Sequence, residues 1–158
     1  SVTSRMRNID INLSHNQLII NEEQIVDMFH FLDESFGPEK IPNGDLSVAF
    51  IDHDTMCQLH SDFLNDPEHT DVMTFPGDIE DGMSGELCVS ADYARESAPQ
   101  HDFSFSDELT LYLLHGWLHL AGHDDLSDEP RVKMREAEKR IMAAVRSANK
   151  LPSFTLEA

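Results

Sequence analysis

The chain has 158 residues, of which 40% are hydrophobic, and its formal net charge at pH 7 is −19. This length suits one domain with a sizeable core, and no apolar run approaches the ~20 residues that a membrane span needs. Residues 41–130 contain one basic and 20 acidic residues, whereas residues 131–150 contain seven basic and two acidic ones. An acidic body repels nucleic acid at long range. Any polyanion would therefore have to be held by the basic segment, by a metal ion or by a partner.

The apolar and capping patterns define the expected elements. In chain order they predict a strand at residues 9–14, a helix at 22–36, a strand at 46–50, a helix at 54–63, strands at 70–76 and 85–90, and helices at 91–98, 107–121 and 127–148. This order predicts an α+β fold in a single domain, residues 1–158, with a small mixed four-stranded sheet packed with about five helices. We expect residues 151–158 to form a loose tail. In the last helix, four residues are predicted to face inward: Val132, Ala137, Ile141 and Val145.

Cellular location and redox state are constrained only weakly. No secretory signal pattern opens the sequence, so we expect a cytoplasmic protein without membrane attachment. The two cysteines, Cys57 and Cys88, do not form a Cys-x-x-Cys pair. We expect both to be reduced thiols in apolar surroundings.

The central feature is the helix predicted at residues 107–121. It carries His115 and His119, which are four residues apart and hence lie on one helical face. Imidazoles in so apolar a helix need polar partners. A glycine that can end the helix comes next, followed by three potential ligands, His123, Asp124 and Asp125. Two such histidines and one ligand from the following turn leave an open position on a zinc-type ion. The pattern therefore predicts a catalytic metal site on this helix.

The residue after the first histidine narrows the chemistry. Zincin peptidases have the motif His-Glu-x-x-His, in which the glutamate is the general base. Here that position is Gly116, which disfavours a metallopeptidase. The glycine either lets a substrate approach the metal or lets the helix pack closely, and the sequence leaves both open. The general base also stays open between metal-bound hydroxide, His123, Asp124 and the 2′-hydroxyl of an RNA substrate.

Three blocks of sequence resemble the bacterial YbeY family of rRNA-maturation endoribonucleases. Residues 115–125, HGWLHLAGHDD, match the family motif His-Gly-x-Leu-His-Leu-x-Gly-Tyr-Asp-His. Residues 70–76, TDVMTFP, match Thr-Asp-Val-Leu-Ser-Phe-Pro, and residues 85–87 match the family's Gly-Glu-Ile/Leu strand. The resemblance covers nearly the whole chain. It implies a zinc-dependent endoribonuclease of single-stranded RNA that acts in 16S rRNA 3′-end maturation and ribosome quality control.

The resemblance also implies ligands and partners. One zinc-class ion per chain would be held by His115, His119 and the residue at the family's third ligand position, Asp125, and would act through a metal-bound water. His123 replaces the family's tyrosine and is the rival third ligand. The family's RNA-contacting arginine is replaced by Leu64. Expected partners are rRNA and the small ribosomal subunit or its proteins, but not DNA.

Several further residues are candidates on chemical grounds. Three residues could support the metal ligands: Thr70, Asp71 and Glu86. The alternatives are that Thr70 and Asp71 end a loop, since an aspartate before a strand is more often a turn residue, and that Glu86 is merely exposed. Three cations of the basic segment are the best candidates for RNA contact, the alternative being a solvated helix face: Arg131, Lys133 and Arg135. A competing function is a non-catalytic assembly factor that uses a metal-stabilised fold to dock on the ribosome.

Overall fold

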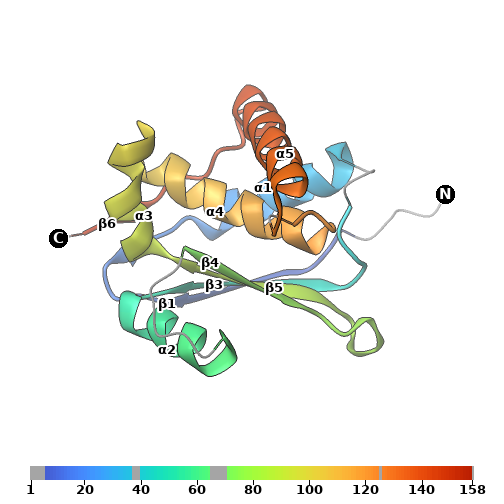
Figure 1. Cartoon of the computed structure of the whole chain (residues 1–158), viewed down its shortest axis with the longest axis horizontal. Coiled ribbons are helices and arrows are strands. Elements are labelled where there is room, and N and C mark those ends of the chain that lie inside the picture. Colours follow the sequence, from blue (N-terminus) through green and yellow to red (C-terminus); the bar gives the residue numbers. More distant parts are fainter. Residues whose placement is uncertain (1–5, 37–39, 65–70, 125, 158) are drawn as a thin grey trace.

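Alternating apolar residues build a central four-stranded sheet. The computed structural model describes residues 6–36, 40–64, 71–124 and 126–157. The strands of the sheet lie in the order β1 (Ile9–Ser14), β3 (Asp45–Ile51), β5 (Met83–Ser90) and β4 (Val72–Pro76). β1, β3 and β5 are mutually parallel, and β4 runs antiparallel to β5. The sheet is therefore mixed, as predicted, and β4 forms one of its edges (Figure 1).

Five α-helices among the described residues flank the sheet. They are α1 (Glu22–Ser35), α2 (His53–Leu64), α3 (Ala91–Ser97), α4 (Phe105–Leu120) and α5 (Asp128–Ser147). α1, α4 and α5 lie over one face and α2 covers the other (Figure 1). A large core fills the α4 side of the sheet, and a smaller cluster fills the α2 side. The α+β fold with a mixed sheet and five helices is confirmed. None of the described helices has the length and apolar character to span a membrane.

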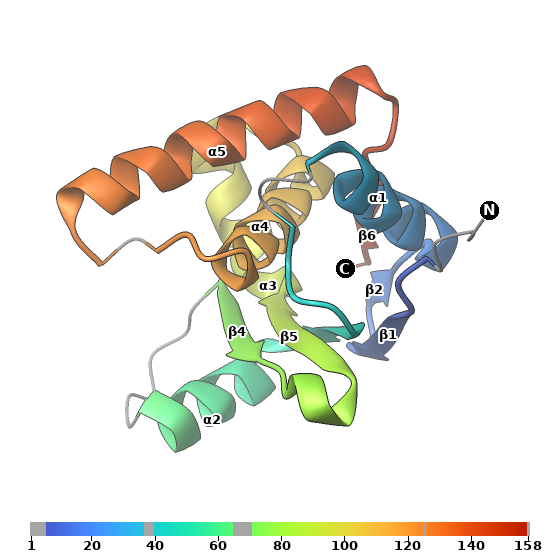
Figure 2. The same ribbon diagram turned by 90° about the vertical axis from the view of Figure 1, so that its right-hand side faces the viewer.

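Helix α4 lies between the sheet and α5 (Figure 2). Its Trp117 and its leucines at 109, 113, 114 and 118 are fully buried. A Cβ atom at Gly116 would come within 2.8 Å of Leu87 Cδ2 and 3.3 Å of Val72 Cγ2. Those contacts are shorter than ordinary van der Waals contact, so the glycine lets α4 approach the sheet closely. Of the two roles left open for Gly116, the structure favours close packing.

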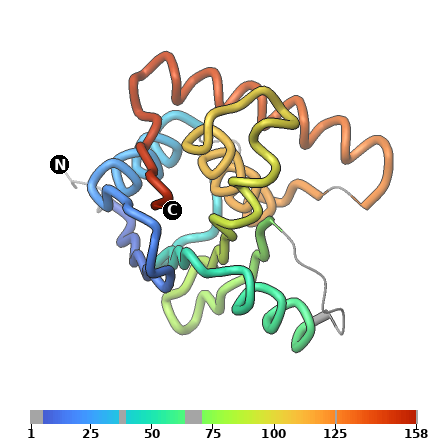
Figure 3. The backbone as a smooth tube through the Cα atoms, turned by 90° about the vertical axis from the view of Figure 1, so that its left-hand side faces the viewer, coloured from blue at the N-terminus to red at the C-terminus, as the bar shows by residue number. Residues whose placement is uncertain are grey.

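The prediction of a loose C-terminal tail is wrong. The segment forms β6 (Thr155–Leu156), which pairs with β2 (Leu18–Ile19), so the C-terminal segment lies beside the N-terminal one (Figure 3). Phe154 is buried, with its ring centroid 5.6 Å from that of Phe50. Its N–H donates to Ser106 Oγ (2.9 Å), and the same hydroxyl donates to its carbonyl oxygen (3.0 Å). Burial of an aromatic ring and paired backbone groups hold this segment in place.

One inward-facing residue of α5 was also predicted wrongly. Val132 is 55% exposed, whereas Ala137, Ile141 and Val145 are buried as expected. The buried stripe begins instead at Met134. Met134 lies three residues before Ala137, which keeps helical spacing, whereas Val132 falls on another face.

Candidate active site

The two histidines of α4 direct their ring nitrogens toward one another. His115 Nε2 and His119 Nε2 lie 3.0 Å apart, and the ring centroids are separated by 4.6 Å with an interplanar angle of 78°. Both side chains are half-buried. The spacing of four residues thus does what the sequence predicted: it brings two imidazole nitrogens to one point near the C-terminal end of the helix.

A glutamate of α5 fixes the ring of the first histidine. His115 Nδ1 lies 2.5 Å from Glu138 Oε2. A carboxylate that is ionised only accepts hydrogen bonds, so Nδ1 is the donor in this pair, and a neutral His115 ring then has its lone pair on Nε2. Metal-binding histidines commonly donate their second ring N–H to a carboxylate in this way. Sequence reasoning missed Glu138, because it lies 23 residues from His115 and no local pattern connects the two.

The donor atoms fit a zinc-class ion. Two nitrogens bound tetrahedrally at about 2.0–2.1 Å lie about 3.3–3.4 Å from each other, close to the 3.0 Å between the Nε2 atoms of His115 and His119. The predicted third ligand, Asp125, lies outside the described residues. Within the described part of the chain, no group of three histidine, cysteine or acidic side chains is placed to hold an ion. The choice between Asp125 and His123 stays a prediction.

The chain turns back directly after the histidine pair. Gly122 has φ +105°, a conformation that favours glycine. The N–H of Gly122 donates to His119 O (3.1 Å), and that of His123 donates to Leu118 O (3.0 Å). These bonds close the last turn of α4 as in a glycine-terminated helix. The helix therefore ends at the glycine that the sequence marked as its stop, and the return of a ligand to the imidazoles stays a prediction.

A cleft of about 470 Å³ opens beside His115. Asp71, Arg131 and Arg135 line it together with His115, so three of the sequence candidates meet at the first histidine. Lys133 is exposed and lies 3.6 Å from Glu129 in an i, i+4 ion pair of α5. Helical periodicity separates it from the two arginines, and it does not line the cleft. Thr70 and the side chain of Leu64 lie outside the described part.

The structure does not bring Glu86 to the histidine pair. Side chains alternate along β5, and Leu87 faces α4, where it packs under Gly116. Glu86 is on the opposite side, where its Oε1 accepts a hydrogen bond from Cys88 Sγ (3.4 Å). Cys88 belongs to the cluster beneath α2, and burial, with Glu86 beside it, raises the pKa of its thiol to about 12. The position of Glu86 argues against a supporting role for it at the metal.

A buried hydrogen-bonded group forms another part of the same cleft. Glu108 on α4 is fully buried, and His101 Nδ1 donates to its Oε1 (2.9 Å). The Tyr112 hydroxyl donates to Glu108 Oε2 (2.8 Å). Burial, reinforced by this bond, raises the pKa of Tyr112, so the phenol stays protonated as a donor. All three residues line the cleft beside His115. Sequence reasoning missed this group, which is joined by contacts that only the fold creates.

Comparison with known proteins identifies the family. A family model described as endoribonuclease YbeY matches residues 8–146. The chain belongs to the endoribonuclease YbeY family. An endoribonuclease YbeY of Protochlamydia amoebophila is 40% identical over 102 residues, which cover 62% of this chain and 68% of the relative. An endoribonuclease YbeY of Bacillus thuringiensis is 31% identical over 138 residues, 79% of this chain and 88% of the relative.

A solved structure has a similar fold. The solution structure of TM1509 from Thermotoga maritima matches with a TM-score of 0.58 at 27% sequence identity. The match covers 90% of this chain and 94% of TM1509. The similarity of fold thus extends over most of the chain.

Proposed function

We propose that this YbeY-family chain is a metal-dependent endoribonuclease that cleaves single-stranded RNA at the 3′ end of 16S rRNA. The observation that carries the proposal is the convergence of the His115 and His119 Nε2 atoms, with His115 held by Glu138, at the edge of a cleft that contains two arginines. The related proteins are named endoribonucleases. Action in the cytoplasm, on the small ribosomal subunit and in ribosome quality control belongs to the proposal through the family resemblance.

The residues of the site would have different roles in binding the metal. His115 and His119 would hold a zinc-class ion, with Asp125 or its rival His123 as the third ligand. When bound, such an ion polarises a phosphoryl oxygen and acidifies a water molecule. Glu138 keeps the proton on His115 Nδ1, so that Nε2 stays available as a donor atom.

The cleft supplies the contact with the RNA backbone. Arg131 and Arg135 can each offer planar, paired N–H donors to phosphate oxygens. They belong to the basic segment of a chain whose net charge is −19, and they offset the acidic residues Asp71, Glu108 and Glu138 that line the same cleft. Binding that depends on these two arginines should weaken steeply as the salt concentration rises.

The proposal is tested with an RNA fragment that carries the 3′ region of 16S rRNA. The purified protein is stripped with a chelator and reloaded with zinc or manganese, and the products are mapped at nucleotide resolution. We expect cleavage within single-stranded RNA only after reloading. A reloaded protein that binds the RNA without cutting it would contradict the proposal. That result would favour the non-catalytic assembly factor, which the acidic body and Leu64 in place of the family arginine make a specific alternative.

Replacement of Glu138 with alanine should weaken metal binding without unfolding the protein. Loss of a carboxylate that orients a metal-binding histidine typically lowers metal affinity by about 10–100-fold, and we expect a loss of that size here. Competition against a chromophoric zinc chelator measures the change. Glu136→Ala removes the same charge from an exposed position of the same helix and should leave zinc affinity unchanged. Equal affinities of the two variants would show that Glu138 does not support the ligand.

A further inference from the structure

A second hollow lies on the other side of the histidine pair. It has a volume of about 730 Å³ and follows the edge strand β4, and we call it the β4 groove. It is lined by His119 of α4 and Phe63 of α2. Phe75 of β4 and Ser84 of β5 line it as well. Figure 2 shows β4 at the sheet edge, with α2 below it and the connection from α4 to α5 above it. The groove is thus continuous with the candidate active site through His119.

The lining of the β4 groove is unusually apolar for an accessible surface. Phe63 is 63% exposed, Ile79 is 65% exposed and Leu126 is 88% exposed, and all three line the groove. The rings of Phe63 and Phe75 lie 5.1 Å apart at an interplanar angle of 65°. No lysine or arginine of the described residues lines it. Apolar side chains gathered in this way mark a binding surface, and an exposed aromatic ring offers a stacking face.

One buried polar atom of a residue that lines the groove has no hydrogen-bond partner among the described residues. Ser84 is 3% exposed, and its Oγ makes no hydrogen bond to any of the described residues. The residue lies at an irregularity of β5, where Asp45 of β3 pairs with Met83 and Leu46 pairs with Gly85. Such a bulge redirects a side chain, and bulges are common beside active sites. A buried hydroxyl without a partner costs free energy, which a ligand that bonds to it would recover.

We propose that the β4 groove binds an unpaired nucleobase of the RNA, next to the phosphate held at the histidine pair. This inference rests on the proposed function. The two chemically different parts of the RNA then bind in different places. The charged backbone lies in the cleft with Arg131 and Arg135, and a neutral base enters the β4 groove on the His119 side. The base stacks on Phe63, and its edge bonds to Ser84 Oγ once a rotation about χ1 turns this buried hydroxyl toward the groove. A hydroxyl both donates and accepts, so the groove selects an unpaired base rather than one base type.

A protein strand is the competing occupant, since β4 is a sheet edge. The features of β4 argue against the addition of a further strand: β4 has five residues and ends at Pro76, which Gly77 follows. Short edge strands and prolines are features that block strand addition. The groove also continues into the site of the histidine pair, which a base beside the cleaved phosphate must reach and a docked peptide need not. These observations favour the base.

The test uses short fluorescent single-stranded RNAs in which one nucleotide at a time is abasic. Affinity is measured by anisotropy with metal-free protein, and cleavage with zinc-loaded protein. We expect one abasic position to lower wild-type affinity about tenfold, the size of one base stack on an aromatic ring. Phe63→Ala should bind the intact RNA about tenfold more weakly and no longer distinguish the abasic one. Ser84→Ala should lower affinity by a smaller factor, about fivefold.

A matched control and the contrary outcomes complete the design. Ile19→Ala removes a half-exposed apolar side chain on β2, away from the groove, and should bind like the wild type. A flat abasic profile with RNA bound equally by wild type and Phe63→Ala would overturn the base assignment alone and leave the groove to a protein segment. A wild-type protein that binds none of the RNAs would overturn the proposed function as well. Equal abasic losses in wild type and Phe63→Ala would place the base elsewhere.

Discussion

Replacement of His119 with alanine should abolish zinc binding and lower RNA cleavage by about a thousandfold or more. A catalytic metal contributes several kcal/mol to the transition state, and each 1.36 kcal/mol corresponds to tenfold in rate. The loss is expected because His119 Nε2 is one of two converging donor atoms, 3.0 Å from its neighbour. Metal content by mass spectrometry and single-turnover cleavage of the same samples measure both effects. His53→Ala, at an exposed histidine of α2, is the matched control and should retain both metal and activity.

The same assay decides the third ligand. We expect Asp125→Ala to lose the ion as His119→Ala does, and His123→Ala to keep it, because position 125 matches the family's third ligand. A carboxylate oxygen is a competent zinc ligand. Loss of the ion in His123→Ala with retention in Asp125→Ala would assign the ligand to the histidine instead. A wild-type protein that takes up no metal even after reloading would contradict the metal site altogether.

The parts of the site that the sequence could predict are those set by local spacing. His115 and His119 meet because a helix turns through 3.6 residues, and Gly122 ends that helix because its φ of +105° suits glycine. The strands of the sheet were predictable for the same reason, since alternation is a local signal. Helical periodicity also places Arg131 and Arg135 on one face and Lys133 on another. The prediction that all three contact RNA did not take this difference into account.

The parts that the sequence could not predict depend on how distant elements pack. Glu138 reaches His115 only because α5 crosses α4 at that point, and nothing in either segment states where the crossing falls. Alternation along a strand places Glu86 and Leu87 on opposite faces of the sheet, but only the fold shows that α4 covers the face of Leu87. The C-terminal segment was too short to show a pattern, yet Phe154 is buried and Ser106 on α4 binds its backbone.

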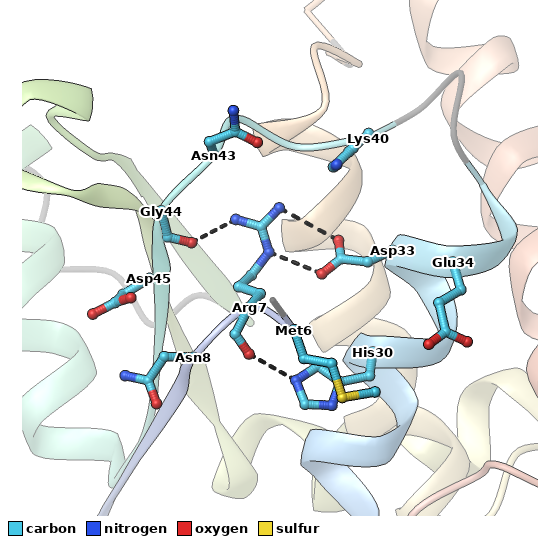
Figure 4. Close-up of a pocket in the computed structure, with 10 residues that line it drawn as sticks. All are labelled: Met6, Arg7, Asn8, His30, Asp33, Glu34, Lys40, Asn43, Gly44 and Asp45. Atoms are coloured by element: carbon cyan, nitrogen blue, oxygen red, sulfur yellow. Dashed lines mark hydrogen bonds and ion pairs between the residues drawn. The ribbon is translucent and has the colours of Figure 1, made fainter. Parts of the chain in front are cut away.

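The buried side chain of Arg7 joins three segments of the chain. It lies in a pocket with residues of α1 and of the segment that leads into β3 (Figure 4). Arg7 Nε donates to Asp33 Oδ2 (2.9 Å), and Nη1 donates to the carbonyl oxygens of Gly44 (2.6 Å) and Pro42 (2.8 Å). Its own carbonyl oxygen accepts from His30 Nε2 (2.7 Å). The guanidinium is therefore saturated by the protein, which makes it a structural clamp rather than an anion site.

Replacement of Arg7 with alanine should lower the free energy of unfolding by about 3–5 kcal/mol, because it leaves the carboxylate of Asp33 and two carbonyl groups without their donor. The side chains of Arg7 and Asp33 are 6% and 16% exposed, so water replaces the lost bonds poorly. Urea unfolding followed by circular dichroism measures the change.

The variant Arg146→Ala is the control. It breaks the pair of Arg146 with Asp107, whose side chains are 53% and 23% exposed, and should lower the free energy of unfolding by no more than about 1 kcal/mol. Equal losses in the two variants would show that burial adds nothing to the Arg7 clamp. The double variant Arg7→Ala/Asp33→Asn should recover part of the loss, since it removes the unpaired charge.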